Sequence, residues 1–474
     1  MEKTALMPRL LACLLLTIAL TVPVPGRAQE LAAALHQRLP QAEVLRLTLA
    51  QAIRIALEKD PGLKQSANQV ASRNIDVAQR QADFAPDLTA RLTGAEHFDK
   101  TIDPLDGNTD RRDYETASGS LDSTVNLFNG FGDIAALRGA ERELAGEQSS
   151  YSRAAQTLLF DTVSAFLQTL SSRELIRVRN ENLGANLQQQ EQVEALYRAG
   201  NRPVSDLYQQ QAETANAVLD LLLAERDYAV ASRRLLQVIG MPPSGRVDLQ
   251  APDLAPLEAA LVALQLGPPD LAALDQRSDL QAAKYQIEAA AEQIDEARAG
   301  YWPTLNLSAS LASDYSSLEK GTDFSRQFFD HNPQADIGLT LAVPIFDRLQ
   351  TRHQVAQARL RQDNARLTLH QRQLQAETEL GQAINDFRTA QQLIGVTKTR
   401  LTAARQALAA MEERYRVGAA TLTELAQLRT QFAEADFERV KARYQLITQE
   451  VAIAYYLGDG QRLQALLDQW ENAQ

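Results

Sequence analysis

The chain has 474 residues, of which 45% are hydrophobic and 23% charged, and its formal net charge is −12. This length accommodates two or three ordinary domains or one extended architecture, and the negative charge argues against a nucleic-acid-binding surface. A single cysteine, Cys13, excludes a disulfide framework and cysteine-ligated zinc. The histidines are scattered, and no nucleophile, paired-carboxylate or metal-ligand pattern is present. We therefore expect no enzymatic activity, no cofactor and no bound metal.

Residues 1–28 are predicted to be a secretory signal peptide. Basic side chains precede an apolar stretch at 10–22, which is shorter than the roughly 20 residues of a membrane-spanning helix. Prolines and small residues follow, and we expect cleavage before Gln29. A lipoprotein signal is the alternative, because the two residues before Cys13 loosely resemble a lipobox. Both interpretations predict export.

The rest of the chain reads as two copies of one unit, residues 60–241 and 276–458. Matching stretches recur at an offset of 217 or 218 positions: 84–88 with 301–305, 125–128 with 343–346, and 197–200 with 415–418. An offset that changes by one residue over such a distance predicts an internal duplication. A proline-rich linker, 242–275, joins the copies. An N-terminal segment (29–59) and a C-terminal tail (459–474) lie outside them.

Each copy predicts the order helix, two strands, long helix, turn, helix. Apolar and polar residues alternate with period two in the predicted strands, at about 87–98, 114–128, 304–314 and 335–346. Polar loops separate the strands of each pair. No proline occurs between residues 105 and 202 or after residue 344. A helix from about 130 to 197 would be about 100 Å long, a length typical of an extended coiled-coil-like assembly.

The alternating strands admit two interpretations. They are either a half-buried soluble sheet or transmembrane β-strands, which are about 9 to 11 residues long. No other segment offers sheet partners, and four strands cannot close a barrel, so a membrane sheet requires several chains to share one barrel. Aromatic residues gather where strands meet helices: Phe84, Phe128, Phe131, Tyr301, Trp302 and Phe346. They suit a membrane-interface girdle or packing at the junction.

Three motifs together resemble the TolC family of outer-membrane efflux proteins, across essentially the whole exported chain. They are the Leu-Phe-Asn-Gly-Phe run at 127–131, the Tyr-Arg-x-Gly turns at 197–200 and 415–418, and the acidic-Leu pairs at 206–207 and 424–425. Each motif is short and indicates little by itself. The resemblance is strong because motifs recur in both copies in the same order.

The resemblance implies a mainly α-helical fold with a small β part. Three copies would share a twelve-stranded outer-membrane β-barrel, four strands from each, above a long α-helical barrel in the periplasm of a Gram-negative bacterium. The homotrimer would contact outer-membrane lipid, a periplasmic adaptor protein and an inner-membrane transporter, but no nucleic acid. It would carry small molecules or proteins outward. The residues alone leave open a secreted or periplasmic helical scaffold without a channel.

By the same resemblance, residues 197–206 and 415–424 are helix–turn–helix tips at the periplasmic end. Gly200 and Gly418 suit helix C-caps. Asp206 and Glu424 either cap the following helices or form an acidic constriction ring. The other residues expected at this constriction are Tyr197, Tyr415, Arg198, Arg202 and Arg416.

The tips also depart from the family pattern. Ala420 stands where the family can carry a basic residue, and Gln427 stands where it can carry a second acidic one. The identity of a latch pair is therefore an open question at this stage.

Overall fold

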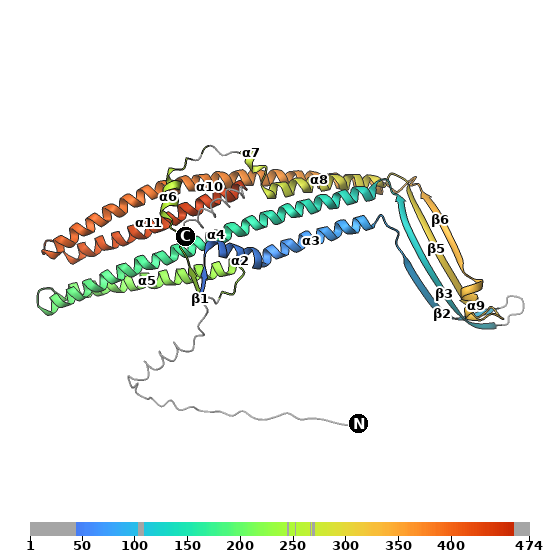
Figure 1. Ribbon diagram of the computed structural model, residues 1–474, viewed down its shortest axis with the longest axis horizontal. Coiled ribbons are helices and arrows are strands. Elements are labelled where there is room, and N and C mark those ends of the chain that lie inside the picture. Colours follow the sequence, from blue (N-terminus) through green and yellow to red (C-terminus); the bar gives the residue numbers. More distant parts are fainter. Residues whose placement is uncertain are drawn as a thin grey trace, which may run out of the picture.

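The computed structural model describes residues 44–102, 109–243, 246–251, 253–265, 267 and 271–458. The predicted signal peptide, residues 29–43 and the C-terminal tail lie outside the described residues. The protein is elongated, with helices along most of its length and a sheet at one end (Figure 1). The prediction of a mainly helical fold with a small β part is thus confirmed.

Six helices form the elongated body, and they occur in three pairs of nearly equal length. In chain order within each half they are α3 (Pro61–Ala82), α4 (Gly132–Arg198) and α5 (Val204–Val238), then α8 (Ser278–Ala299), α10 (Gln350–Arg416) and α11 (Leu422–Leu457). Both α4 and α10 have 67 residues, which corresponds to about 100 Å at 1.5 Å per residue. The predicted long helix of the first half is therefore confirmed within two residues at each end.

The hydrophobic core is concentrated near the middle of the helical body. Its largest fully buried side chains include Phe166 of α4, Leu235 of α5, Phe387 of α10 and Leu446 of α11. The long helices carry polar residues on most of their other positions, so this waist holds the largest cluster of buried apolar side chains. Burying a Leu or Phe side chain contributes about 1.5–3 kcal/mol, so the waist supplies much of the folding energy.

Short elements surround this waist (Figure 1). They are β1 (Val44–Leu47), α2 (Leu49–Lys59), β4 (Arg246–Leu249), α6 (Ala255–Ala263) and α7 (Leu271–Leu274). Strands β1 and β4 pair in parallel. They form a separate two-stranded sheet and do not extend the four alternating strands, so within the described residues those four strands have no other sheet partner, as expected. Strands of four residues, one of them inside a proline-rich linker, are too short to give a readable alternation.

Four antiparallel strands form the terminal sheet in the order β2-β3-β5-β6. Their bounds are β2 Thr89–Ile102, β3 Thr109–Phe128, β5 Thr304–Ser316 and β6 Gln334–Ala342. Strand β6 ends four residues before the predicted end at 346, because Pro344 lacks the N–H that the ladder needs. Strands β2 and β6 are the two edges.

The register places the apolar side chains on one face of this sheet. Leu121 of β3 lies opposite Leu311 of β5, and Leu307 lies opposite Leu339 of β6. Directly paired residues point to the same side, and the residues between them on each strand are mostly polar. Leu92 is 84% exposed and Ile337 83% exposed. The single chain thus presents one large apolar sheet face to its surroundings.

Between β5 and β6 the chain forms α9 (Phe324–Arg326) and a π-helical turn, η1 (Gln327–His331). The sequence pattern indicated only a polar loop here. No helix within the described ranges contains an apolar stretch that could cross a membrane.

Candidate functional site

The two predicted tips lie together at the end of the molecule remote from the sheet (Figure 1). Gly200 and Gly418 both have φ +76°, a conformation that glycine adopts without a Cβ penalty. Each is followed by a hydrogen bond back across the last helical turn, from Asn201 N to Leu196 O (2.9 Å) and from Ala419 N to Arg414 O (2.8 Å). The predicted glycine C-caps are present in both turns.

The second tip contains the predicted capping box. The amide of Thr421 donates to the Glu424 carboxylate (2.7 Å), and the amide of Glu424 donates to the Thr421 hydroxyl oxygen (3.2 Å). These hydrogen bonds from the Thr421 backbone and side chain lower the pKa of Glu424 below its ordinary value. Glu424 is therefore engaged in starting α11.

The first tip is built differently, although Asp206 occupies the equivalent position. Helix α5 follows Pro203 and has no side-chain cap. A proline in that place has no N–H for the Asp206 carboxylate to accept. The Asp206 carboxylate instead pairs with Arg202 at 3.4 Å. The predicted capping role is correct for Glu424 and wrong for Asp206.

Arg202 connects the two tips. Its side chain is only 24% exposed, and its guanidinium carbon lies 4.8 Å from the centre of the Tyr415 ring. Burial raises the pKa of the Tyr415 hydroxyl, so this ring stays neutral at physiological pH. Arg202 thus combines an ion pair within its own hairpin with a cation–π contact to the other hairpin.

Further contacts hold the tips side by side. Leu207 of α5 and Leu422 of α11 share a small buried cluster with Val193. Gln209 donates a hydrogen bond to the Thr423 hydroxyl oxygen (3.1 Å). Sequence reasoning missed this polar bridge, because the two residues are more than 200 positions apart and do not occupy equivalent places in the two copies.

The other two predicted cations do not reach a tip carboxylate. Arg198 pairs with Glu194 of its own helix and is 75% exposed. Arg416 pairs with Glu413, also one turn away, at 2.6 Å. The neighbouring Tyr197 is 40% exposed. Among the described residues, Arg202 is accordingly the cation that the fold places against Asp206.

The predicted aromatic residues gather at the junction of sheet and helices. All except Phe128 are among the exposed large hydrophobic residues, and Phe128 meets Phe131 edge to face at 5.3 Å. Gly130, with φ +69°, packs so closely that a Cβ would lie 2.6 Å from Cβ of Trp302. Trp302 therefore packs against the backbone of Gly130, and the rest of its side chain is exposed.

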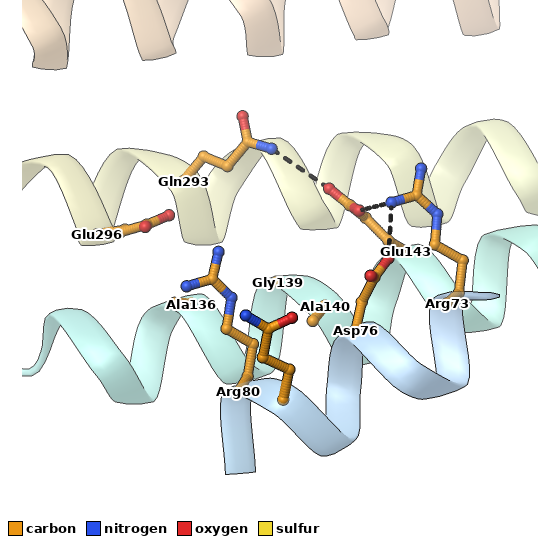
Figure 2. A pocket seen from close by; sticks show the side chains of 10 residues that line it. Arg73, Asp76, Arg80, Ala136, Gly139, Ala140, Glu143, Gln293 and Glu296 are labelled. Atoms are coloured by element: carbon orange, nitrogen blue, oxygen red, sulfur yellow. Dashed lines mark hydrogen bonds and ion pairs between the residues drawn. The ribbon is translucent and has the colours of Figure 1, made fainter. Parts of the chain in front are cut away.

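A polar cavity of about 250 Å³ lies between α3, α4 and α8. In Figure 2, Arg73 of α3 points toward Glu143 of α4 (2.9 Å) and Asp76 (3.3 Å), while Gln293 of α8 reaches the same Glu143 (3.4 Å). Arg73 is paired with two of the three acidic side chains that line the cavity, and no Ser, Thr, Cys or His lines it. We interpret it as polar packing of three helices.

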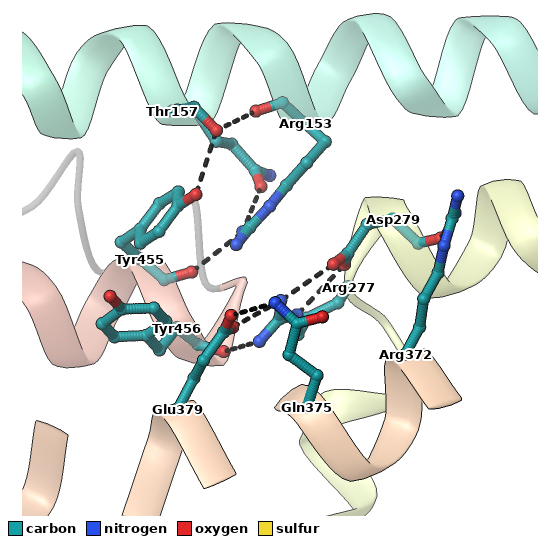
Figure 3. Close-up of polar contacts among 10 residues, drawn as sticks. Arg153, Thr157, Arg277, Asp279, Arg372, Gln375, Glu379, Tyr455 and Tyr456 are labelled. Atoms are coloured by element: carbon teal, nitrogen blue, oxygen red, sulfur yellow. Dashed lines mark hydrogen bonds and ion pairs between the residues drawn. The ribbon is translucent and has the colours of Figure 1, made fainter. Parts of the chain in front are cut away.

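A buried ion cluster lies near the waist, where the end of α11 meets α8 and α10 (Figure 3). Arg277, 3% exposed, pairs with Asp279 (2.8 Å) and Glu379 (3.2 Å) and donates to the carbonyl of Tyr456 (3.2 Å). Burial alone would raise the pKa of Asp279, but the hydrogen bond and charge of Arg277 outweigh it and lower that pKa. The cluster holds the start of α8, the middle of α10 and the end of α11 together.

No group of three or more His, Cys, Asp or Glu side chains in the described part of the chain is placed to hold a metal ion. The distinctive features are instead a sheet with one exposed apolar face, about 100 Å of helix, and two tips joined through Arg202. These features describe a conduit or scaffold better than a reaction centre.

Known proteins share this architecture. The sequence profile of the family described as "Outer membrane efflux protein" matches residues 52–241 and 272–459. The outer membrane efflux protein BepC of Brucella suis is 24% identical over 86% of this chain and 84% of its own. The pyoverdine export outer membrane protein OpmQ of Pseudomonas aeruginosa is 27% identical over 80% of this chain and 78% of its own.

Solved structures agree in fold. The CusC structure, titled as a study of folding and transmembrane channel formation, superposes with a TM-score of 0.74 at 18% identity, covering 87% of this chain and 92% of CusC. Relatives of this kind lie in the outer membrane of Gram-negative bacteria, with the helical part in the periplasm. Because the family profile covers most of both halves, the protein belongs to the outer membrane efflux protein family and is a channel component, not an enzyme.

Proposed function

We propose that the protein works as a homotrimeric exit duct, carrying small molecules or proteins from an inner-membrane transporter across the periplasm and outer membrane. A periplasmic adaptor protein would hold the transporter and the duct together. The observation that carries the proposal is the terminal sheet, whose apolar face carries large exposed side chains such as Leu92, Leu311 and Ile337 in the single chain.

The sheet's edges support a trimer. Strands β2 and β6 are unpaired on their outer sides within the described chain, and open edges cannot be accommodated in hydrocarbon. Four strands are too few to close around a lumen, whereas three copies supply twelve. Pairing β6 of one copy with β2 of the next would satisfy both edges and turn every apolar face toward lipid.

The duplication that we propose for residues 60–241 and 276–458 is supported by matching local geometry. Helices α4 and α10 have equal lengths and start at positions 218 residues apart. Each is preceded by a residue in the left-handed conformation, Phe131 (φ 68°) and Leu349 (φ 63°), which lie at the same offset. The two copies would alternate around the helical barrel, six in a trimer.

The tips are proposed to form the periplasmic mouth. In a trimer, Asp206 and Arg202 would recur around the axis, so breaking the contacts of Arg202 would separate the two hairpins of each copy and widen the opening. Glu424 contributes to this mouth mainly by holding the start of α11. Tyr197, Arg198 and Arg416 are exposed and would face adaptor or solvent.

Fractionation and electrophysiology test the proposal together. The protein should sediment with outer membranes on a sucrose gradient, require detergent for extraction, and conduct ions as a trimer in a planar bilayer. The alternative is a periplasmic helical scaffold. Release of the full-length protein by high salt alone, together with a bilayer that remains silent, would favour that scaffold.

A further inference from the structure

The apolar face of the sheet has a shallow patch of small side chains near its far end. The four members lie in two neighbouring rows across β2, β3 and β5: Gly94 opposite Ala117, and Gly119 opposite Ser313. Tyr315 completes the first row and Leu92 the second, so the small residues leave space between these two larger side chains.

The segment between β5 and β6 fills this patch with aromatic rings. A ring atom of Phe328 lies 2.7 Å from the place where a Cβ on Gly119 would stand, so only glycine permits the contact. Phe324 stacks on Phe328 at 5.2 Å and meets Tyr315 edge to face at 5.1 Å. Phe329 adds a further edge contact with Phe328.

Polar contacts fix the segment to the sheet. Gln327 is fully buried (0% exposed). Its side-chain oxygen accepts from Ser316 N (2.9 Å) and its amide donates to Ser316 O (3.2 Å). Ser313 donates to the carbonyl of Phe328 (2.6 Å), and Asn332 donates to that of Asp314 (2.8 Å). The backbone of α9 and η1 is thus held in place while Phe329 remains 68% exposed.

The level of these rings matches the thickness of an outer membrane. Ser313 lies nine residues beyond Thr304, the start of β5 beside Trp302. Nine residues at about 3.3 Å give about 30 Å along the strand, or about 23 Å along the membrane normal for a tilt near 40°. Outer-membrane barrels carry an apolar band about 25 Å tall between two aromatic girdles.

The same face turns acidic just beyond the rings. Glu96 of β2 lies directly opposite Glu115 of β3, two residues past the Gly94 pair and on the same side of the sheet. Two carboxylates opposite one another are unfavourable in hydrocarbon and suit water. The continuous apolar band therefore ends at this pair, and Phe98, 66% exposed, lies beyond it on the same face.

From these observations we propose that residues 317–333 are an interface anchor, with Phe324, Phe328 and Phe329 at the boundary between acyl chains and headgroups of the outer leaflet. The proposal rests on the proposed placement of the sheet in the outer membrane. The aromatic residues beside Trp302 would mark the periplasmic boundary, and this segment would mark the opposite one, which sets the depth of the barrel.

Site-directed spin labelling tests the anchor in the full-length protein. In a Cys13→Ser background the chain has no other cysteine, so Phe329→Cys, Ile337→Cys and Thr340→Cys each carry one nitroxide. The protein is reconstituted in vesicles of phosphatidylethanolamine and phosphatidylglycerol. Collision rates of each label with oxygen, which partitions into lipid, and with a water-soluble nickel chelate are then measured.

The anchor predicts that labels at 329 and 337 collide more with oxygen than with the nickel chelate, and that the label at 340, on the polar face of the same strand as 337, does the reverse. If the label at 329 is exposed to water while the label at 337 is exposed to lipid, the anchor is refuted but the proposed duct is not. A label at 329 shielded from both reagents would also refute the anchor, because another protein would then cover the segment. Water exposure at both 329 and 337 would instead refute the membrane placement.

Discussion

Arg202 is the residue whose replacement tests the mouth most sharply. The Arg202→Met substitution keeps the length and apolar stem of the side chain and removes its charge. It breaks the ion pair with Asp206 (3.4 Å) and the contact with the Tyr415 ring (4.8 Å). The hydrophobic contacts of Leu207 and Leu422 remain, so the tips should loosen without unfolding.

The contacts set the size of the effect. A partly exposed ion pair at this distance contributes up to about 1 kcal/mol, and the cation–π contact contributes about 0.5–1 kcal/mol. Their loss, up to about 2 kcal/mol per chain, shifts the equilibrium toward separated hairpins by up to roughly 30-fold. The substitution also leaves Asp206 without its counter-ion, so cation selectivity should rise. Asp206→Asn should lower it.

Planar-bilayer recording of the purified protein measures both the conductance, which reports the opening of the mouth, and the cation selectivity. The matched control is Arg198→Met, because Arg198 is highly exposed and pairs only with Glu194 of its own helix. We expect Arg202→Met to increase the mean conductance and the reversal potential for cations, and Arg198→Met to leave both near the wild-type values. Indistinguishable recordings from the two variants would refute the role assigned to Arg202.

Three other features give predictions of their own. Arg277→Met should lower the free energy of unfolding by about 3 kcal/mol, because it leaves the Asp279 and Glu379 carboxylates, which are 26% and 28% exposed, without their buried partner. The control is Arg298→Met, which removes an exposed ion pair and should cost about 0.5 kcal/mol or less. Equal urea midpoints for the two variants, measured by circular dichroism, would contradict this difference. The pKa of Glu424 is lowered in the folded state, so its capping contribution is present above the ordinary carboxyl pKa and lost as pH falls through the folded value. The protection of the first α11 amides against hydrogen exchange should therefore decrease as the pH falls through the pKa of Glu424 in the folded protein. Glu424→Gln should abolish this pH dependence. Gly119→Leu should displace the Phe328 ring and accelerate proteolysis of segment 317–333. An unchanged rate of cleavage would contradict the packing of Phe328 on Gly119.

Long-range periodicity made the main elements predictable. The absence of proline over nearly a hundred positions and the alternation of apolar residues depend only on local chemistry, and α4, β3 and β5 follow them closely. The end of β6 was missed because the alternation continues through Val343 and Ile345, although Pro344 cannot donate to the ladder.

The tip could be predicted only in part. Glycine caps and the Thr421 capping box have local signatures, whereas the partner of Asp206 depends on Pro203, whose missing N–H frees the carboxylate. The contact of Arg202 with Tyr415 joins residues more than 200 positions apart, and no local pattern encodes it. The segment with Phe324 and Phe328 was read as polar because its aromatic rings are interspersed with charged residues, without helical or strand spacing.

Single-channel recording of the detergent-purified trimer tests most directly whether this chain forms a conducting duct. A trimeric duct should give stable, ohmic, cation-selective steps that grow when Arg202 is replaced by methionine. A purified trimer that inserts into the bilayer, as judged by lipid-exposed labels at residue 337, and yet passes no current in either form would contradict it.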